Sequence, residues 1–406
     1  MASLSTAPAG GDSSGIHDVA PRWSAVYALA LCSFVLVASE FMPVSLLSPI
    51  AQTLRLTEGQ AGQAIAVSGI FAVAASLSLT AVLGTLDRRI VLLMLTALLV
   101  VSGTIVALAP SYAIFIIGRA LLGLAIGGFW SMSAAIAMRL VPSASVPKAL
   151  AIINGGNALA TVVAAPLGSL LGSLIGWRGA FFCVVPVAVG AVVWQALSLP
   201  RLPAQHRQTA TGMMMLLRRP PVLLGLGAVA LLFVGQFALF TYLRPFLEQV
   251  TGVGPTMLST MLLILGVSGF VGTILIGRVL EDGLYRTLIV LPAIMAATAV
   301  ALAVFGGSTA ATAILLAIWG LAGTSAPVAW WTWLARTLPD EAEAGGGLMV
   351  AIVQLAITLG ATVGGIVFDR AGPVAEFLAS AALLALATLA ALAIVRSRRT
   401  LATSHA

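Results

Sequence analysis

Twelve apolar blocks, each near the length of a bilayer-spanning helix, run through this chain of 406 residues. About twenty apolar residues in a helix cover the hydrocarbon core of a bilayer. Lipid offers no partner to an open strand edge, and the blocks lack the alternation of a barrel strand. We therefore expect an all-α membrane protein with twelve transmembrane helices. The expected spans are about 24–48, 63–84, 90–109, 112–136, 149–175, 179–199, 222–246, 257–280, 286–305, 309–335, 346–368 and 374–395.

Composition excludes most soluble classes of protein. Hydrophobic residues make up 60% of the chain and charged residues 8%, whereas soluble domains carry about a quarter charged residues. The sequence has no G-x-x-x-x-G-K-[ST] phosphate loop, which argues against direct coupling to ATP. His17, His206 and His405 all fall outside the expected spans, so we expect no histidine metal site. We predict no enzyme, no metal and no organic cofactor.

The basic residues indicate the orientation of the spans. They are dispersed over many short loops instead of forming one patch, which argues against nucleic acid as a partner. An even number of spans puts both termini on one side of the membrane. That side would hold fifteen Lys and Arg residues and the other four: Arg55, Arg178, Arg244 and Arg370. The positive-inside rule then predicts cytoplasmic termini.

An internal repeat at an offset of about 196 to 197 residues divides the chain into halves. Glu40 matches Gln236, and Arg139-Leu-Val-Pro142 matches Arg336-Thr-Leu-Pro339. Parallel repeats of this kind flank a central cavity that opens to each side in turn. The expected domains are a polar tail (1–22), a six-helix bundle (23–199), a cytoplasmic linker (200–221), a second six-helix bundle (222–396) and a tail (397–406).

Two charged residues lie well inside expected spans, Glu40 in the first and Arg119 in the fourth. An isolated ion there costs at least about 2.5–3.5 kcal/mol, so each needs a partner or a water-filled cavity. Glu40 can take up a proton and Arg119 effectively cannot, which makes Glu40 the candidate proton carrier and Arg119 the fixed charge. The alternative is that Glu40 merely neutralises Arg119.

Polar and aromatic residues in the spans are candidates for the wall of the cavity. Amides suit a neutral polar ligand, although they also join helices to one another. Tryptophan can stack on a flat ring, although it more often packs or anchors a helix. The candidates are Asn157, Gln236, Tyr242, Gln354, Trp130 and Trp330.

Small residues recur on one face of the fifth span. Gly156, Gly168 and Gly172 are spaced by multiples of four residues, and Pro166 bends the same helix. Small residues let a second helix approach closely, and proline removes a backbone hydrogen bond. Ordinary helix packing and a specific gating role both explain this pattern.

Three motifs together resemble the major facilitator superfamily, in particular its twelve-span drug:proton antiporter group. They are Gly84-Thr-Leu-Asp87-Arg88-Arg89, Arg119-Ala-Leu-Leu-Gly123 and Ala165-Pro166-Leu-Gly168-Ser169. The resemblance implies the major facilitator fold, with Gly84, Asp87, Arg88 and Arg89 controlling a cytoplasmic gate. It also implies proton coupling through Arg119 and gating at Pro166 and Gly168. The loop motif is shorter than usual, since it lacks a glycine and the second basic cluster.

Longer stretches are similar to bacterial purine ribonucleoside efflux pumps. They include Ser39-Glu-Phe-Met-Pro-Val-Ser-Leu-Leu-Ser-Pro49, Gly127-Gly-Phe-Trp-Ser-Met-Ser-Ala134 and Thr241-Tyr-Leu-Arg-Pro245. This similarity implies an inner-membrane antiporter that exports inosine, guanosine and purine analogues in exchange for protons. Because two halves are fused in one chain, we expect a monomer. Export of arabinose-like sugars or of drugs is the alternative within transport. A membrane receptor that binds without turnover is the alternative of another class.

Overall fold

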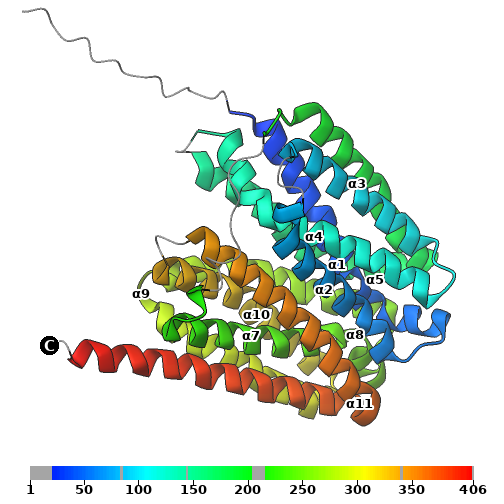
Figure 1. Ribbon diagram of the computed structural model, residues 1–406. Coiled ribbons are helices and arrows are strands. Elements are labelled where there is room, and N and C mark those ends of the chain that lie inside the picture. Colours follow the sequence, from blue (N-terminus) through cyan, green and yellow to red (C-terminus); the bar gives the residue numbers. More distant parts are fainter. Residues whose placement is uncertain (1–20, 83–85, 143–144, 204–214, 339–341, 405–406) are drawn as a thin grey trace, which may run out of the picture.

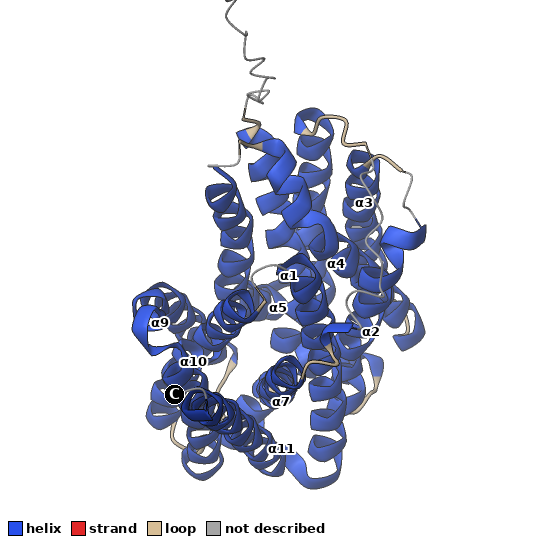
Figure 2. Ribbon diagram, turned by 60° about the vertical axis from the view of Figure 1, so that its left-hand side comes forward, coloured by secondary structure: helices blue, strands red, loops and turns tan. Residues whose placement is uncertain are grey.

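The computed structural model describes residues 21–82, 86–142, 145–203, 215–338 and 342–404. Within these ranges the chain forms helices joined by short loops, and Figure 2 shows no strand among them. The helices form two bundles, one from each half of the sequence (Figure 1). The predicted all-α fold is confirmed.

The N-terminal bundle is built from five helical segments, which follow each other with short connections. They are α1 (Trp23–Leu54), α2 (Glu58–Val82), α3 (Arg88–Ala107), α4 (Tyr112–Leu140) and α5 (Val146–Ser198). Small residues on α5 let it lie directly against α1, because a Cβ at Gly156 would collide with the Ala30 carbonyl. The packing explanation of the small-residue face therefore applies inside this bundle.

The C-terminal bundle repeats this arrangement with a broken first helix. Its segments are α7 (Pro220–Thr241), α8 (Leu243–Phe246), η2 (Leu247–Thr251), α9 (Pro255–Phe305), α10 (Thr309–Thr337) and α11 (Ala342–Ser404). Tyr242 interrupts the helix between α7 and α8, and η2 is a short π-helical turn that ends at Gly252 with φ 70°.

Two long helices each hold a sharp turn at one glycine. The φ and ψ angles are 76° and 163° at Gly176 in α5, and 83° and 175° at Gly372 in α11. These glycines are 196 residues apart, so the backbone itself shows the internal repeat. A positive φ costs glycine little, which is why this residue makes both turns.

The number of membrane crossings follows from these turns. Ten described helical stretches are long and apolar enough to cross a membrane, and two of them span 51 and 52 residues. At about twenty residues per crossing, each of these two crosses twice. The prediction of twelve crossings is confirmed.

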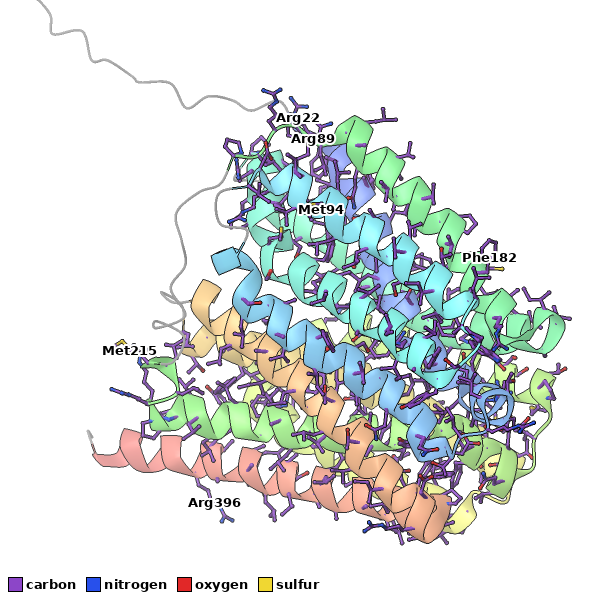
Figure 3. All side chains as sticks on the ribbon, turned by 45° about the vertical axis from the view of Figure 1, so that its right-hand side comes forward. Arg22, Arg89, Met94, Phe182, Met215 and Arg396 are labelled. Carbon is purple, nitrogen blue, oxygen red and sulfur yellow. The ribbon has the colours of Figure 1, made fainter. Side chains whose placement is uncertain are left out.

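The surface of the bundles also fits a lipid environment. Met94 and Phe182 project from the flank of the N-terminal bundle (Figure 3) and are 53% and 51% exposed. Arg22 and Arg89 gather at one end of that bundle in the same view. Large apolar side chains on the flanks and charges at the ends are the pattern of a membrane-embedded bundle.

The two bundles contact each other mainly at one end. The starts of α1 and α7, at Trp23 and Pro220, define the linker end; the turns at Gly176 and Gly372 define the far end. Hydrogen bonds between described residues of different bundles all lie between the middle of the helices and the far end. In Figure 1 the bundles meet near α8 and diverge toward the marked C-terminus. The far end is therefore closed in this structure.

Candidate functional site

A hydrogen bond between the two bundles lies near the middle of the molecule, between Glu40 and Gln354. Gln354 Nε2, on α11, donates to Glu40 Oε1, on α1, at 3.4 Å. Glu40 is 3% exposed and Gln354 is 7% exposed. The buried acid of one bundle is thus held by the neutral amide of the other. The bond is long, and Gln354 Oε1 has no partner among the described residues.

Arg119 holds the backbone around Glu40. Its guanidinium donates to the carbonyl oxygens of Ser39, Glu40 and Ala64 at 2.6, 3.0 and 3.1 Å, and to Ser68 Oγ at 3.1 Å. The described residues contain no ion pair between the Glu40 carboxylate and this guanidinium. The guanidinium thus lies beside the acid and bonds the backbone around it instead of its carboxylate.

Aromatic rings from both bundles meet next to Glu40. The ring of Phe41 stacks on Phe237 with centroids 5.5 Å apart, and it meets Phe240 edge-on at 6.0 Å. Gln236, the repeat-equivalent of Glu40, donates from Nε2 to the Gly323 carbonyl at 3.2 Å. Its Oε1 is buried without a partner among the described residues. The middle of the molecule thus holds stacked aromatic rings from both bundles beside amide groups with unused capacity.

Three more predicted cavity residues lie in different surroundings. Trp330 is 1% exposed, packs edge-on against Trp333 at 5.5 Å, and its Nε1 has no partner in the described part of the chain. Trp130 is half-buried and meets Phe129 edge-on at 5.4 Å. Asn157 is half-buried on α5. Their roles in binding stay predictions.

Polar residues of α11 form a row against α2, which we call the interbundle row. The hydroxyl of Thr358 donates to the Ala66 carbonyl at 3.2 Å. The hydroxyl of Thr362 donates to Gln63 Oε1 at 3.3 Å. With Gln354 these threonines repeat every four residues, so they share one face of the helix.

Asp369 continues this face to the far end. Its carboxylate accepts the Thr57 hydroxyl at 2.6 Å and the Gly59 N–H at 2.9 Å, both from the start of α2. Glycines make the close approach possible, because a Cβ at Gly59 would collide with Asp369 and with the Gly365 carbonyl. The far end is thus closed by an acid that caps a helix of the other bundle.

Tyr242 lies in the same closed contact. Its hydroxyl donates to the Ala361 carbonyl at 2.7 Å, and its ring stacks on Phe368 at 5.3 Å. A Cβ at Gly62 or at Gly365 would collide with this hydroxyl. The sequence predicts a cavity residue here, whereas the structure places Tyr242 in the seal between the bundles.

Arg244 makes another contact between the bundles. It pairs with Glu248 at 2.8 Å and donates to the Ser45 carbonyl on α1. Behind Ser45 lies Gly168, where a Cβ would collide with the Ser45 hydroxyl. Gly168 therefore supports the part of α1 that receives Arg244, and Pro166, half-buried, lies two residues before it on α5.

The predicted gate motif lies at the linker end. Asp87 Oδ1 accepts the N–H groups of Arg89 and Leu202, each at 2.8 Å. The Arg88 N–H donates to the Leu202 carbonyl at 2.8 Å, and the Arg89 guanidinium donates to the Ala196 carbonyl at 2.7 Å. These bonds join the loop to the end of α5, inside one bundle. Gly84 lies outside the described residues.

Sequence reasoning missed several residues of this arrangement. Thr358, Thr362 and Asp369 could have been found, because their spacing from Gln354 puts them on one helical face. Glu376 could not, since it falls at the start of the last expected span and gives no sign of being buried. In the structure Glu376 is 0% exposed.

Comparison with known proteins identifies relatives over nearly the whole chain. A family model described as the Major Facilitator Superfamily matches residues 29–350. The "Transcription regulatory protein OpdE" of Pseudomonas aeruginosa is 56% identical over 380 residues, covering 93% of this chain and 94% of that protein. The "Purine ribonucleoside efflux pump NepI" of Salmonella paratyphi B is 43% identical over 376 residues, covering 93% and 95%.

Solved structures share the fold at low sequence identity. A bacterial homolog of the human lysosomal transporter Spinster, in an inward-facing and unoccupied conformation, has a TM-score of 0.75 at 16% identity, covering 92% of this chain and 97% of that chain. A mutant form of the nucleoside transporter NupG has a TM-score of 0.74 at 14% identity, covering 92% and 99%. At these identities the likeness shows the fold alone.

Proposed function

The chain belongs to the Major Facilitator Superfamily of membrane transporters, and on that premise we propose that it exports purine ribonucleosides in exchange for protons. The observation that carries this proposal is the Glu40–Gln354 hydrogen bond. A buried acid that bonds the other bundle at mid-molecule can link its own protonation to the separation of the bundles. The efflux pump at 43% identity supports purine ribonucleosides as the substrate class.

The proton and the substrate would act on the same contact. Gln354 Nε2 lies 3.4 Å from Glu40 Oε1, and the charged form of Glu40 is the better acceptor for this N–H group. A proton on Glu40 removes this charge and leaves the amide free for a ligand. Arg119 holds the surrounding backbone throughout, so the change is confined to the carboxyl group. Exchange of one proton for one neutral nucleoside moves one net charge, worth about 2.3 kcal/mol per 100 mV.

The surroundings of Glu40 suit a nucleoside. A purine base is flat, and the rings of Phe41 and Phe237, which stack on each other here, come from different bundles and would expose apolar faces to the base when they separate. The free amide oxygens of Gln236 and Gln354 could accept hydrogen bonds from the base or the ribose. Inosine and guanosine are the expected substrates, with purine analogues as further ones.

The orientation of the chain gives the direction of transport. By the positive-inside bias, the linker end with both termini faces the cytoplasm of a bacterial inner membrane. The closed far end then faces outward, and the structure corresponds to an inward-facing state. A single chain carries both bundles, so we propose that the monomer is the functional unit.

The decisive experiment is flux of radiolabelled inosine in proteoliposomes under an imposed proton gradient. We expect gradient-driven inosine movement, with simultaneous proton movement, that Glu40→Gln abolishes and Glu40→Asp partly retains. Gln52 is an exposed amide outside the site, so Gln52→Ala serves as the matched control for loss of active protein during preparation. Competition by arabinose or by a cationic dye, but not by guanosine, would change the substrate assignment to a sugar or a drug.

A second candidate function follows from the relative named as a transcription regulatory protein, at 56% identity. A membrane receptor on this scaffold would bind its ligand without moving it. The same proteoliposomes separate the two, because they contain no other protein. Saturable inosine binding with no flux, in vesicles shown to be sealed and correctly inserted, would favour the receptor.

A further inference from the structure

Glu376 is a buried acid with no role in the mechanism above. It lies on α11, four residues beyond the turn at Gly372. Its side chain is 0% exposed, and neither Oε1 nor Oε2 has a hydrogen-bond partner among the described residues. Glu40, by contrast, accepts a hydrogen bond from Gln354.

The elements around Glu376 belong to its own bundle. One turn along α11, the Ser380 hydroxyl donates to the Gly235 carbonyl of α7 at 2.6 Å. The neighbouring Phe377 stacks on Phe246 of α8, with ring centroids 3.9 Å apart. Glu376 is thus enclosed where α7, α8 and α11 meet.

The charged and titratable groups near this point can be named. Helix α7 has none, α8 has Arg244, η2 has Glu248, and α11 has Asp369 and Arg370. Arg244 and Glu248 pair with each other. Across the seal, α2 carries Glu58 and the start of α4 carries Tyr112. Tyr242 lies between α7 and α8, the helices that enclose Glu376, and its hydroxyl lies in the seal between the bundles.

An ionised carboxylate in such a place is strongly disfavoured, because it has neither water nor a donor. The neutral acid is the form that this closed state accommodates. Tyr242 connects α7 to α8, the helices that cover Glu376, and Gly62 of the opposite bundle lies against the Tyr242 hydroxyl. When α2 withdraws from α11, Tyr242 loses this partner and the cover of Glu376 loosens. The carboxyl group can then meet water at the far end and ionise.

We propose that Glu376 is a second proton-binding site, which takes up a proton from the far side as the far end closes and returns it to that side as the far end opens. The inference rests on the proposed transport cycle. In it, the carboxylate and one proton form the neutral carboxylic acid, and reopening reverses that step. The proton on Glu376 is not carried across the membrane; it sets how readily the empty transporter closes outward and returns to the inward-facing state.

The test measures opening of the far end directly, without substrate. The native thiols are removed by Cys32→Ala and Cys183→Ser, and Gln63→Cys places one thiol in the interbundle row. The rate at which a membrane-impermeant thiol reagent labels it from the far side reports opening. We expect this rate, corrected for the reagent's own pH dependence, to rise with far-side pH by up to about tenfold per unit, the limit for one proton. In Glu376→Gln we expect slow labelling that is independent of pH.

Three variants separate Glu376 from its neighbours. Ser380→Ala changes the adjacent polar group but not the acid, and Asp369→Asn and Glu40→Gln remove two of the other acids; all three should keep the pH dependence. Loss of the dependence in Asp369→Asn or Glu40→Gln, with retention in Glu376→Gln, overturns the proposal. Infrared spectroscopy provides a second reading, because the carboxylic acid band of the closed state should lose a component in Glu376→Gln. An unchanged band also overturns it.

The outcomes distinguish this inference from the proposed function. A pH-dependent opening that needs Glu376, in a protein that moves no inosine, would keep the proton site and discard the substrate assignment. Coupled inosine flux with pH-independent opening would keep the substrate assignment and discard the proton site at Glu376.

Discussion

The carboxylate of Asp369 caps α2, a helix of the other bundle, by accepting the Thr57 hydroxyl at 2.6 Å and the Gly59 N–H at 2.9 Å. A helix cap normally belongs to the helix's own chain segment. Thr57 and Gln60 cap α2 locally, but the Gly59 N–H is satisfied by Asp369, 310 residues away in sequence, so this bond exists only while the far end is closed.

Removal of this cap should favour the open far end. Asp369→Ala loses both hydrogen bonds, and a lost cap costs roughly 1–2 kcal/mol, which shifts the closed-to-open ratio about five- to thirtyfold. Far-side labelling of the thiol in Gln63→Cys should accelerate by that factor. Asp369→Asn, which keeps one acceptor oxygen, should lie between. Equal labelling in all three proteins would show that the cap contributes nothing to closure.

A single added methyl group should prevent tight closure at Gly62. A Cβ there would collide with the Tyr242 hydroxyl, whereas a Cβ at Gly155 meets no atom within 4 Å. Gly62→Ala should therefore lower the inosine transport rate severalfold, and Gly155→Ala should leave it unchanged. Tyr242→Phe removes the clashing oxygen, so Gly62→Ala combined with Tyr242→Phe should regain part of the rate. A double variant as slow as Gly62→Ala would rule out this collision as the cause.

The planar shape of the Arg119 side chain should matter to stability as well as its positive charge. It donates four hydrogen bonds to three backbone carbonyls and one hydroxyl, and a bond of this kind contributes about 1.5–3 kcal/mol. Lysine keeps the charge but cannot present the planar fork. Thermal unfolding in detergent should show both Arg119→Ala and Arg119→Lys destabilised, the former more. Arg201→Ala, at an exposed position, should match the parent. A lysine variant with parental stability and flux would contradict the fork requirement.

Gln354 should affect both binding and coupling. Gln354→Ala leaves Glu40 without its only donor among the described residues and removes a candidate substrate ligand. A loss of about 1.4 kcal/mol would raise the inosine dissociation constant roughly tenfold. Isothermal titration in detergent can measure this, with Gln52→Ala as the control. Unchanged inosine affinity would remove Gln354 from the substrate site and leave it as a structural contact of Glu40.

Much of the architecture follows from the sequence because bilayer thickness dictates a repeating length. The spans, the two halves and the 196-residue offset are readable from apolar blocks, and Gly176 and Gly372 confirm the offset in the backbone. Glu40 and Arg119 stand out because charges are rare in such blocks. That Arg119 bonds the Glu40 backbone and not its carboxylate depends on helix rotation, which the pattern does not specify.

The closed end was less predictable. Asp369 and Thr57 look like ordinary polar residues at helix ends, and their pairing depends on which end of the bundles happens to be shut. Glu376 looks like a polar residue at a membrane boundary until α7 and α8 are seen to cover it. The contacts of such residues form in one conformational state, whereas a sequence must be compatible with every state of the cycle.

The glycines at 59, 62 and 365 have a further consequence, for energy conservation. Any exporter driven by protons must not let protons pass when no cargo moves, since an unproductive leak would dissipate the gradient on which the whole cell depends. Where α2 and α11 touch, backbone lies almost on backbone, and Tyr242 fills the remaining notch. In the proposed exporter, the absence of side chains at these three positions would thus help to insulate the closed far end against protons.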